Sequence, residues 1–166
     1  MSMNKRFTGF TLLEMAAVIA ILGIVAAAAI PSYAHFIQRQ QLRNAADALM
    51  RDLRNARELS VSSRSAIFVN YRAGKSWCWG VSRGQPCDCS GAAPPACNLS
   101  RGDNKEFPDV MLDIAQDLEF SPGLGQVSQH GAAALRTLKG HNLRVVLNPM
   151  GRASVCGRDA VGGQPC

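Results

Sequence analysis

The sequence predicts an α+β fold in which a long N-terminal helix packs on a small antiparallel β-sheet domain. Residues 10–30 are apolar or Gly except for Thr11 and Glu14, and a helical apolar period continues from Leu42. Beyond Ser65 the pattern changes to short runs of β-branched and aromatic residues separated by Gly, Pro and Asn. The 166 residues leave room for one such helix and a single domain of about 100 residues.

The first segment of the predicted helix, residues 10–30, has the length and composition of a membrane span. At 1.5 Å per residue it covers about 30 Å, the thickness of a bilayer hydrocarbon core. Lys5 and Arg6 precede it and the next Lys or Arg is Arg39, so the positive-inside bias predicts a cytoplasmic N-terminus and an exported remainder. A carboxylate inside a span costs roughly 2.5–3.5 kcal/mol on insertion scales, so Glu14 indicates a function and a partner.

The hexapeptide from Gly9 to Glu14, GFTLLE, follows a short basic leader and resembles the class III signal of type IV pilins and type II secretion pseudopilins. The resemblance implies that residues 1–9 are a leader, that a prepilin peptidase cuts between Gly9 and Phe10, and that Phe10 is then N-methylated. It also implies that Glu14 meets the N-terminal amine of a neighbouring subunit. The implied partners are other pilin or pseudopilin subunits, the peptidase and an inner-membrane assembly platform.

The N-terminus has two other interpretations. An ordinary secretory signal would be cut near Ala26 to Ala29, but an acidic residue within its apolar region is unfavourable. A one-helix anchor without processing leaves both Glu14 and the Gly9-Phe10 pair without a role. Both interpretations are therefore weaker than the prepilin signal, which predicts a single-pass inner-membrane protein with a periplasmic domain that later enters a filament.

The helix is expected to continue as an amphipathic segment over residues 31–62. Its apolar positions follow the 3.6-residue period of a helix that buries one face. These positions are Leu42, Ala45, Ala46, Leu49, Leu53, Ala56 and Leu59. Pro31 removes a backbone donor and Gly23 lowers helix propensity, so the stretch between them is the expected place for a kink or for unwinding.

Residues 63–166 are predicted to form the β-rich globular domain. The expected strands are residues 66–71, 77–81 and 143–147, with weaker candidates at 118–121 and 153–156. The stretch from Gly84 to about Pro108 is rich in Gly, Pro, Ser and Cys and is expected to be an irregular, Cys-rich loop. We find no internal repeat.

All cysteines lie in the part of the chain predicted to be periplasmic, where an even number indicates disulfides. They are Cys78, Cys87, Cys89, Cys97, Cys156 and Cys166. Cys156 and Cys166 are expected to close a C-terminal loop. The other four allow three pairings; a bond between Cys87 and Cys89 would be strained, so each is expected to join Cys78 or Cys97. A metal site at Cys87-Asp88-Cys89 is the alternative, but its spacing is not that of a usual zinc site.

The run from Trp77 to Val81, the cysteines after it, and the segment from Asn148 to Arg152 resemble one branch of the family, the GspH/FimT-type minor pilins and pseudopilins. The resemblance implies a structural subunit. We find no nucleophile motif, paired-carboxylate spacing or phosphate-binding glycine loop, so no catalytic residue, cofactor or metal is assigned. A type IV pilus and a type II secretion pseudopilus are not separated by these residues.

DNA binding is the alternative function. Some FimT-type minor pilins bind DNA through a C-terminal Gly-Arg-x-Arg motif, in which guanidinium groups contact phosphates. The corresponding positions here are Gly151, Arg152, Ala153 and Ser154, so the second arginine is missing. Arg158 lies four residues beyond Ser154 and is the candidate to replace it. The formal net charge of +6 is a mild excess that does not identify an anionic partner by itself.

Overall fold

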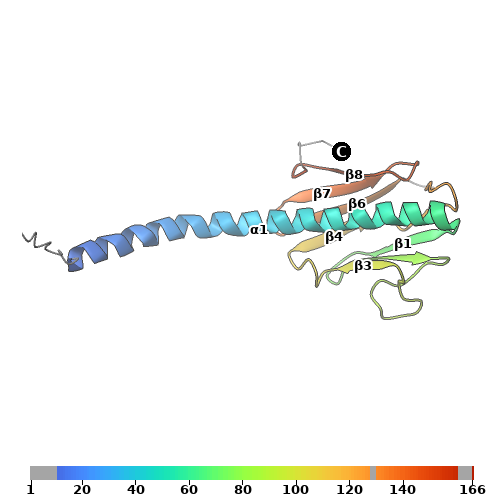
Figure 1. The fold of residues 1–166 in the computed structure, drawn as a ribbon. Coiled ribbons are helices and arrows are strands. Elements are labelled where there is room, and N and C mark those ends of the chain that lie inside the picture. Colours follow the sequence, from blue (N-terminus) through green and yellow to red (C-terminus); the bar gives the residue numbers. More distant parts are fainter. Residues whose placement is uncertain (1–10, 128–129, 161–165) are drawn as a thin grey trace, which may run out of the picture. The chain divides into compact units, whose positions relative to one another are not determined.

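The structure, a computed structural model, describes residues 11–127, 130–160 and 166, and for residues 28–32 it describes the backbone only (Figure 1). In these described residues one helix, α1 (Leu12–Ser63), precedes eight strands. The strands are β1 (Ile67–Arg72), β2 (Cys78–Arg83), β3 (Ser100–Asp103), β4 (Val110–Ala115), β5 (Leu118–Phe120), β6 (Gly131–Thr137), β7 (Asn142–Leu147) and β8 (Ala153–Cys156). Residues Ile37–Cys166 form one compact unit and the part up to Phe36 forms another.

In the N-terminal unit the apolar side chains of α1 are exposed. Leu12 is 88% exposed and Ile24 is 73% exposed, so this segment buries little of its apolar surface within its own chain. Among the residues described, no helical segment is long and apolar enough to span a bilayer. Phe10 and the side chains of residues 28–30, which belong to the predicted span, lie outside the described residues. The span therefore stays a prediction.

Helix α1 is continuous from Leu12 to Ser63. Our expectation of unwinding between Gly23 and Pro31 is not met in this structure. A single proline costs one backbone hydrogen bond, and the helix keeps its other bonds on both sides of it. The C-terminal end is well defined, because Arg64 adopts a positive φ of 49° and the Ser63 hydroxyl donates to the Leu59 carbonyl at 2.6 Å.

The C-terminal half of α1 buries the predicted stripe. Leu42, Leu49 and Leu53 are at most 2% exposed, as are Ala45, Ala46 and Ala56. Leu59 is only partly buried, and Ser60 takes the fully buried position in the last turn. The Ser60 hydroxyl can be buried because it donates to the Arg57 carbonyl at 2.7 Å. The amphipathic helix is thus confirmed, except that Ser60 and not Leu59 is fully buried in its last turn.

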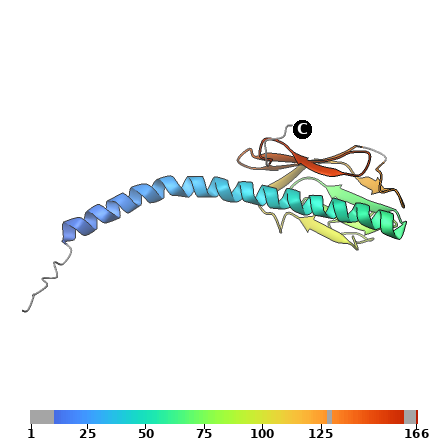
Figure 2. The same ribbon diagram turned by 45° about the horizontal axis from the view of Figure 1, so that its top comes forward.

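The globular unit contains two antiparallel sheets of four strands each, with strand orders β3-β2-β1-β5 and β4-β6-β7-β8. The C-terminal half of α1 runs along both sheets in two views (Figures 1 and 2), and one apolar cluster joins it to the sheets. All five predicted strand regions are strands. Sequence reasoning missed β3, β4 and β6, and the loop predicted from Gly84 to Pro108 contains β3.

The missed strands lack strong local signals. Strand β6 is rich in Ala, a good helix former, although its burial alternates strictly along the chain. In β4 a register shift between Leu112 and Ile114 breaks the alternation. Strand β3 is the polar segment Ser100–Asp103, whose strand conformation depends on pairing with β2. Tertiary pairing therefore decides these three elements.

Two buried tryptophans connect the first sheet to its surroundings. The rings of Trp77 and Trp79 stack with centroids 5.5 Å apart, and both stack on Phe107. Trp79 Nε1 donates to Asp52 Oδ2 of α1 at 2.7 Å, and Trp77 Nε1 donates to the Val110 carbonyl at 2.6 Å. Each indole thus buries its ring while its N–H keeps a partner.

Candidate functional site

The start of α1 carries the Glu14 side chain, while Gly9 and Phe10, the predicted processing site, lie outside the described residues. Glu14 Oε2 accepts hydrogen bonds from the Thr11 amide at 3.0 Å and the Thr11 hydroxyl at 3.1 Å. The Glu14 amide donates back to Thr11 Oγ1 at 3.3 Å. This reciprocal arrangement is a capping box, which satisfies backbone donors at a helix start.

Thr11 is a residue that our sequence reasoning missed, although its signal was present. A Thr followed three residues later by Glu, before an apolar run, is the sequence signature of a capping box. The carboxylate of Glu14 is thereby held beside the Thr11 amide, one residue after the predicted new N-terminus at Phe10. Glu14 is exposed in the single chain, so it can also accept a bond from another molecule.

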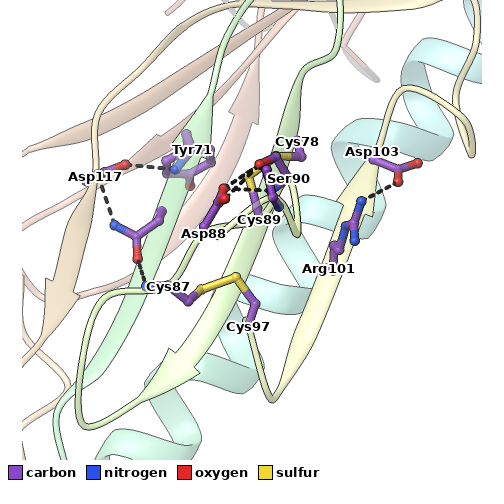
Figure 3. Close-up of a disulfide and its surroundings, with 12 residues drawn as sticks. Tyr71, Cys78, Cys87, Asp88, Cys89, Ser90, Cys97, Arg101, Asp103 and Asp117 are labelled. Atoms are coloured by element: carbon purple, nitrogen blue, oxygen red, sulfur yellow. Dashed lines mark hydrogen bonds and ion pairs between the residues drawn. A yellow bond between two sulfur atoms is a disulfide. The ribbon is translucent and has the colours of Figure 1, made fainter. Parts of the chain in front are cut away.

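In the Cys-rich loop between β2 and β3 the structure selects one of the pairings left open. Cys78 is bonded to Cys89, and Cys87 to Cys97. All six cysteines of the chain are in disulfides, which removes the thiolates that the metal alternative required. Hydrogen bonds connect the loop to Asn70 of β1 (Figure 3). Cys87 N donates to Asn70 Oδ1 at 2.9 Å, and Asn70 Nδ2 donates to Asp117 at 2.9 Å.

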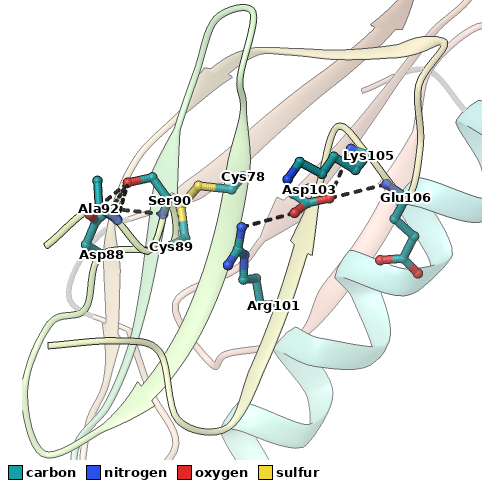
Figure 4. A network of polar contacts seen from close by, with 9 residues as sticks. All are labelled: Cys78, Asp88, Cys89, Ser90, Ala92, Arg101, Asp103, Lys105 and Glu106. Carbon is teal, nitrogen blue, oxygen red and sulfur yellow. Dashed lines mark hydrogen bonds and ion pairs between the residues drawn. A yellow bond between two sulfur atoms is a disulfide. The ribbon is translucent and has the colours of Figure 1, made fainter. Parts of the chain in front are cut away.

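The tip of this loop is organised by Asp88. Its carboxylate accepts from the Ser90 amide at 2.9 Å and the Ser90 hydroxyl at 2.7 Å (Figure 4). It also accepts from the Ala93 amide at 3.0 Å. These bonds, chiefly the one from the Ser90 hydroxyl, lower the pKa of Asp88 because they favour the charged form. Asp103 plays a similar part nearby, where it accepts from Arg101 and from the amide of Lys105.

The loop folds back over the outer face of β2, and Gly80 makes this approach possible. A Cβ atom at Gly80 would lie 2.1 Å from Cys97 Sγ and 3.0 Å from Cys89 Cβ. Five consecutive residues of β2 are buried as a result, since the helix covers one face and the disulfides cover the other. The Cys-rich segment is thus a second layer on the sheet.

The C-terminal loop is closed by the bond between Cys156 and Cys166. Within it, Asp159 contacts α1 and the β6–β7 turn. Its carboxylate lies 3.4 Å from Arg39 Nε and 3.0 Å from His141 Nδ1, and its carbonyl accepts from Arg43 at 3.3 Å. The Asn142 amide also donates to Asp159, at 3.0 Å. No feature of the sequence indicated this residue.

The two arginines proposed for DNA contact line different pockets. Arg152 lines a pocket of about 250 Å³ with Arg54 and Arg57 of α1. Arg57 Nε donates to the Met150 carbonyl at 3.0 Å, next to Gly151, whose φ of 71° permits the tight turn. Arg158 lines two other pockets, one of them shared with Arg144. The structure therefore separates Arg158 from Arg152 and brings helix arginines to Arg152.

The chain is similar to known proteins in its N-terminal sequence and in its fold. A family model described as the prokaryotic N-terminal methylation motif matches residues 4–30. Two crystal structures of the type IV minor pilin FimU of Pseudomonas aeruginosa (strain PAO1) are similar to the chain at 22% identity. The structure in space group P21 covers 75% of this chain and 95% of its own, with a TM-score of 0.53. The structure in P65 covers 72% and 95%, with a TM-score of 0.51. No curated protein has a significant sequence match.

Proposed function

We propose that this chain, which is type IV minor pilin-like in its N-terminal motif and in its fold, is a structural subunit of a type IV pilus. The observation that carries the proposal is the combination of a methylation motif at residues 4–30 with a minor-pilin fold in the same chain. A type II secretion pseudopilus uses the same signal, helix and sheet, and is the alternative assembly. Neighbouring genes for a secretin, a secretion ATPase and other pseudopilins would favour that alternative.

The proposed mechanism is polymerisation. The chain inserts in the inner membrane with its N-terminus in the cytoplasm, is cut between Gly9 and Phe10, and is methylated on Phe10. The exposed apolar side chains from Leu12 onward are then covered by lipid or by the helices of other subunits, because apolar surface of this extent is unstable in water. This role is structural and needs no catalytic residue.

Glu14 is proposed to guide assembly by pairing with the N-terminal amine of a neighbouring subunit. Within a low-dielectric filament core, a cation and a carboxylate offset part of each other's desolvation cost. The capping box supports this role, since it holds the carboxylate at the helix start and occupies Oε2 with Thr11 donors. The other oxygen, Oε1, can accept a bond from the neighbour.

The experiment that tests this role separates assembly from capping. Glu14→Gln removes the charge but keeps an acceptor for the cap, whereas Thr11→Ala removes the cap partner and keeps the charge. We expect Glu14→Gln to reduce incorporation into sheared filaments strongly while membrane insertion is unchanged, and Thr11→Ala to reduce it much less. Equal incorporation of Glu14→Gln and wild type would overturn the assembly role.

The proposed cleavage between Gly9 and Phe10 is tested separately, by the mass of the mature chain. The mass of the mature chain is expected to correspond to an N-terminus at methylated Phe10. Gly9→Ala is expected to preserve the longer precursor, because the peptidase of the family cuts after glycine. A normal mature mass from the Gly9→Ala variant would contradict the cut site.

DNA binding is a second candidate function, and one observation favours it. The second arginine missing after Arg152 has counterparts on α1, because Arg54 and Arg57 line the same pocket as Arg152. We expect the full chain in detergent to bind duplex DNA with an affinity that falls steeply with salt. Arg54→Gln with Arg152→Gln should lower the salt slope by about two, and Arg72→Gln with Arg83→Gln, the matched control, should not. Absence of binding at low salt would remove this candidate.

A further inference from the structure

A basic pocket lies where three separate parts of the globular unit meet. It has a volume of about 410 Å³ and is lined by α1, the β6–β7 turn and the C-terminal disulfide loop. Its basic side chains are Arg39, Arg43, Lys139 and Arg158. The function proposed above uses none of them.

The charges of this pocket are unbalanced. Asp159 is the only acidic residue among those that line it, and its side chain is 11% exposed. Its carboxylate is already engaged by Arg39, His141 and the Asn142 amide. Within the part of the chain that the structure describes, neither Lys139 nor Arg158 forms an ion pair, so an excess of positive charge is available to a ligand.

The pocket is also held in shape without a ligand. The disulfide between Cys156 and Cys166 closes the loop that carries Arg158, and Arg43 donates to the Asp159 carbonyl from α1. The turn that carries Lys139 is closed by a bond from the Thr137 amide to the His141 carbonyl at 2.9 Å. The backbone segments that carry Lys139 and Arg158 are fixed in this way, so they need not be ordered when an anion binds.

These donors suit a phosphate group. Guanidinium and ammonium groups form charge-assisted hydrogen bonds to phosphate oxygens, and several of them converging on a concave surface favour a compact polyvalent anion. A carboxylate would satisfy fewer of them. The chemistry of the pocket is therefore that of a phosphate site.

The position of Arg39 in the sequence indicates the source of the phosphate. Arg39 lies nine residues after Ile30, the end of the predicted span, so chain connectivity keeps it near the membrane surface. Long basic side chains close to the end of a span can reach anionic headgroups. Arg54, in the other basic pocket, lies 24 residues after Ile30.

We propose that the pocket formed by Arg39, Arg43, Lys139 and Arg158 binds the phosphate of an anionic phospholipid headgroup while the subunit waits in the membrane. The proposal rests on the membrane anchoring that is part of the proposed function. It adds a lipid contact that would be exchanged for contacts with other subunits when the chain enters a filament. Binding of the lipid and entry into the filament are therefore separate events with separate measurements.

The test uses the purified full chain in a non-ionic detergent. Short-chain phosphatidylglycerol, short-chain phosphatidylcholine and inorganic phosphate are titrated separately by calorimetry. The test variant is Lys139→Gln with Arg158→Gln, which leaves the Asp159 contacts intact. The matched control is Lys75→Gln with Lys105→Gln, which removes the same charge at exposed positions outside the pocket.

We expect phosphatidylglycerol to bind the wild type more tightly than phosphatidylcholine does. Its Kd should rise at least about tenfold in the test variant and less than about twofold in the control. Equal losses in both variants, or no preference for the anionic lipid, would overturn the proposal. Inorganic phosphate binding as tightly as the lipid would assign the pocket to free phosphate instead.

Filament assembly provides the distinguishing measurement. Glu14→Gln should lower incorporation without changing the lipid affinity, so failure of the proposed function and failure of this inference give different results. If the test variant loses incorporation while its lipid affinity is unchanged, the pocket is a subunit contact and the lipid proposal is wrong.

Discussion

The two disulfide-closed regions of the globular unit differ in what holds them in place. The Cys-rich loop between β2 and β3 has two disulfides and is organised by Asp88, whose partners are within five residues. The C-terminal loop has one disulfide and is attached through Asp159 to Arg39, Arg43 and the β6–β7 turn. Apart from the bond from Cys87 N to Asn70, the first region is stabilised by local contacts and close packing, and the second by polar contacts between distant parts of the chain.

This difference explains how the two regions are suited to different roles. Close packing against Gly80 fixes the Cys-rich loop on the outer face of β2 and leaves little room for change. The C-terminal loop instead presents charged groups around a pocket, where a ligand or another subunit can compete for them. Substitutions in the two regions should therefore change stability by different amounts, and these changes should depend differently on solution conditions.

The largest effect is expected from removing the disulfide between Cys78 and Cys89 by changing both residues to Ala. Closing a loop of this length stabilises by about 3 kcal/mol through the unfolded state, and both sulfurs are buried. The Tm should fall by roughly 8–15 °C in a calorimetric scan. Cys156→Ala with Cys166→Ala removes the disulfide of a loop of nearly equal length but should cost less, because Asp159 still attaches that loop. A loss as large as the first would contradict the comparison.

Gly80→Ala tests the close packing directly. The added Cβ would overlap Cys97 Sγ, and overpacking of this kind costs about 1–3 kcal/mol in the free energy of unfolding. The same substitution in a chain that also carries Cys87→Ala and Cys97→Ala should cost much less, since the overlapping sulfur is absent. Additive losses in denaturant titrations would show that Cys97 is not the obstacle.

Asp159→Asn is expected to lower the free energy of unfolding by about 1–2 kcal/mol. The substitution keeps the size of a side chain that is 11% exposed but removes its charge beside Arg39 and His141. Asp113→Asn is the matched control, because Asp113 pairs with Arg136 at the surface and such pairs contribute little. Equal effects of the two variants in urea titrations would mean that the attachment through Asp159 is unimportant.

The smallest effect concerns the pH dependence of the Cys-rich loop. The pKa of Asp88 is lowered in the folded chain, chiefly by the Ser90 hydroxyl. Its contribution to stability is therefore present above the unfolded pKa and is lost as the pH falls through the folded value. NMR titration should give a pKa below the ordinary value of about 3.9, and Ser90→Ala should raise it toward that value. An unchanged pKa in Ser90→Ala would contradict this assignment.

Much of the fold could be predicted from local pattern. The helix follows from its 3.6-residue period, and the strands that carry β-branched or aromatic residues follow from their composition. The Ala-rich strand β6 and the polar strand β3 could not be predicted in this way. Their conformation comes from hydrogen bonds to β7 and β2, which are contacts between distant residues.

The same distinction between local pattern and distant contacts applies to the candidate sites. Thr11 and Glu14 are three residues apart, so their capping box was available to a sequence reading, although we did not recognise it. The grouping of Arg54 and Arg57 with Arg152 was not available, since about a hundred residues separate them. Arg158 is only six positions from Arg152, but strand β8 runs between them and the two residues line different pockets.

The N-terminal signal, the long amphipathic helix and the even number of cysteines follow from the amino-acid sequence, because each is encoded in neighbouring residues or in a regular period. Which cysteines pair, how β2 is covered on both faces and which basic residues share a pocket follow from the folded structure. These features depend on how distant segments pack, and no local pattern records the distance between Asp159 and Arg39.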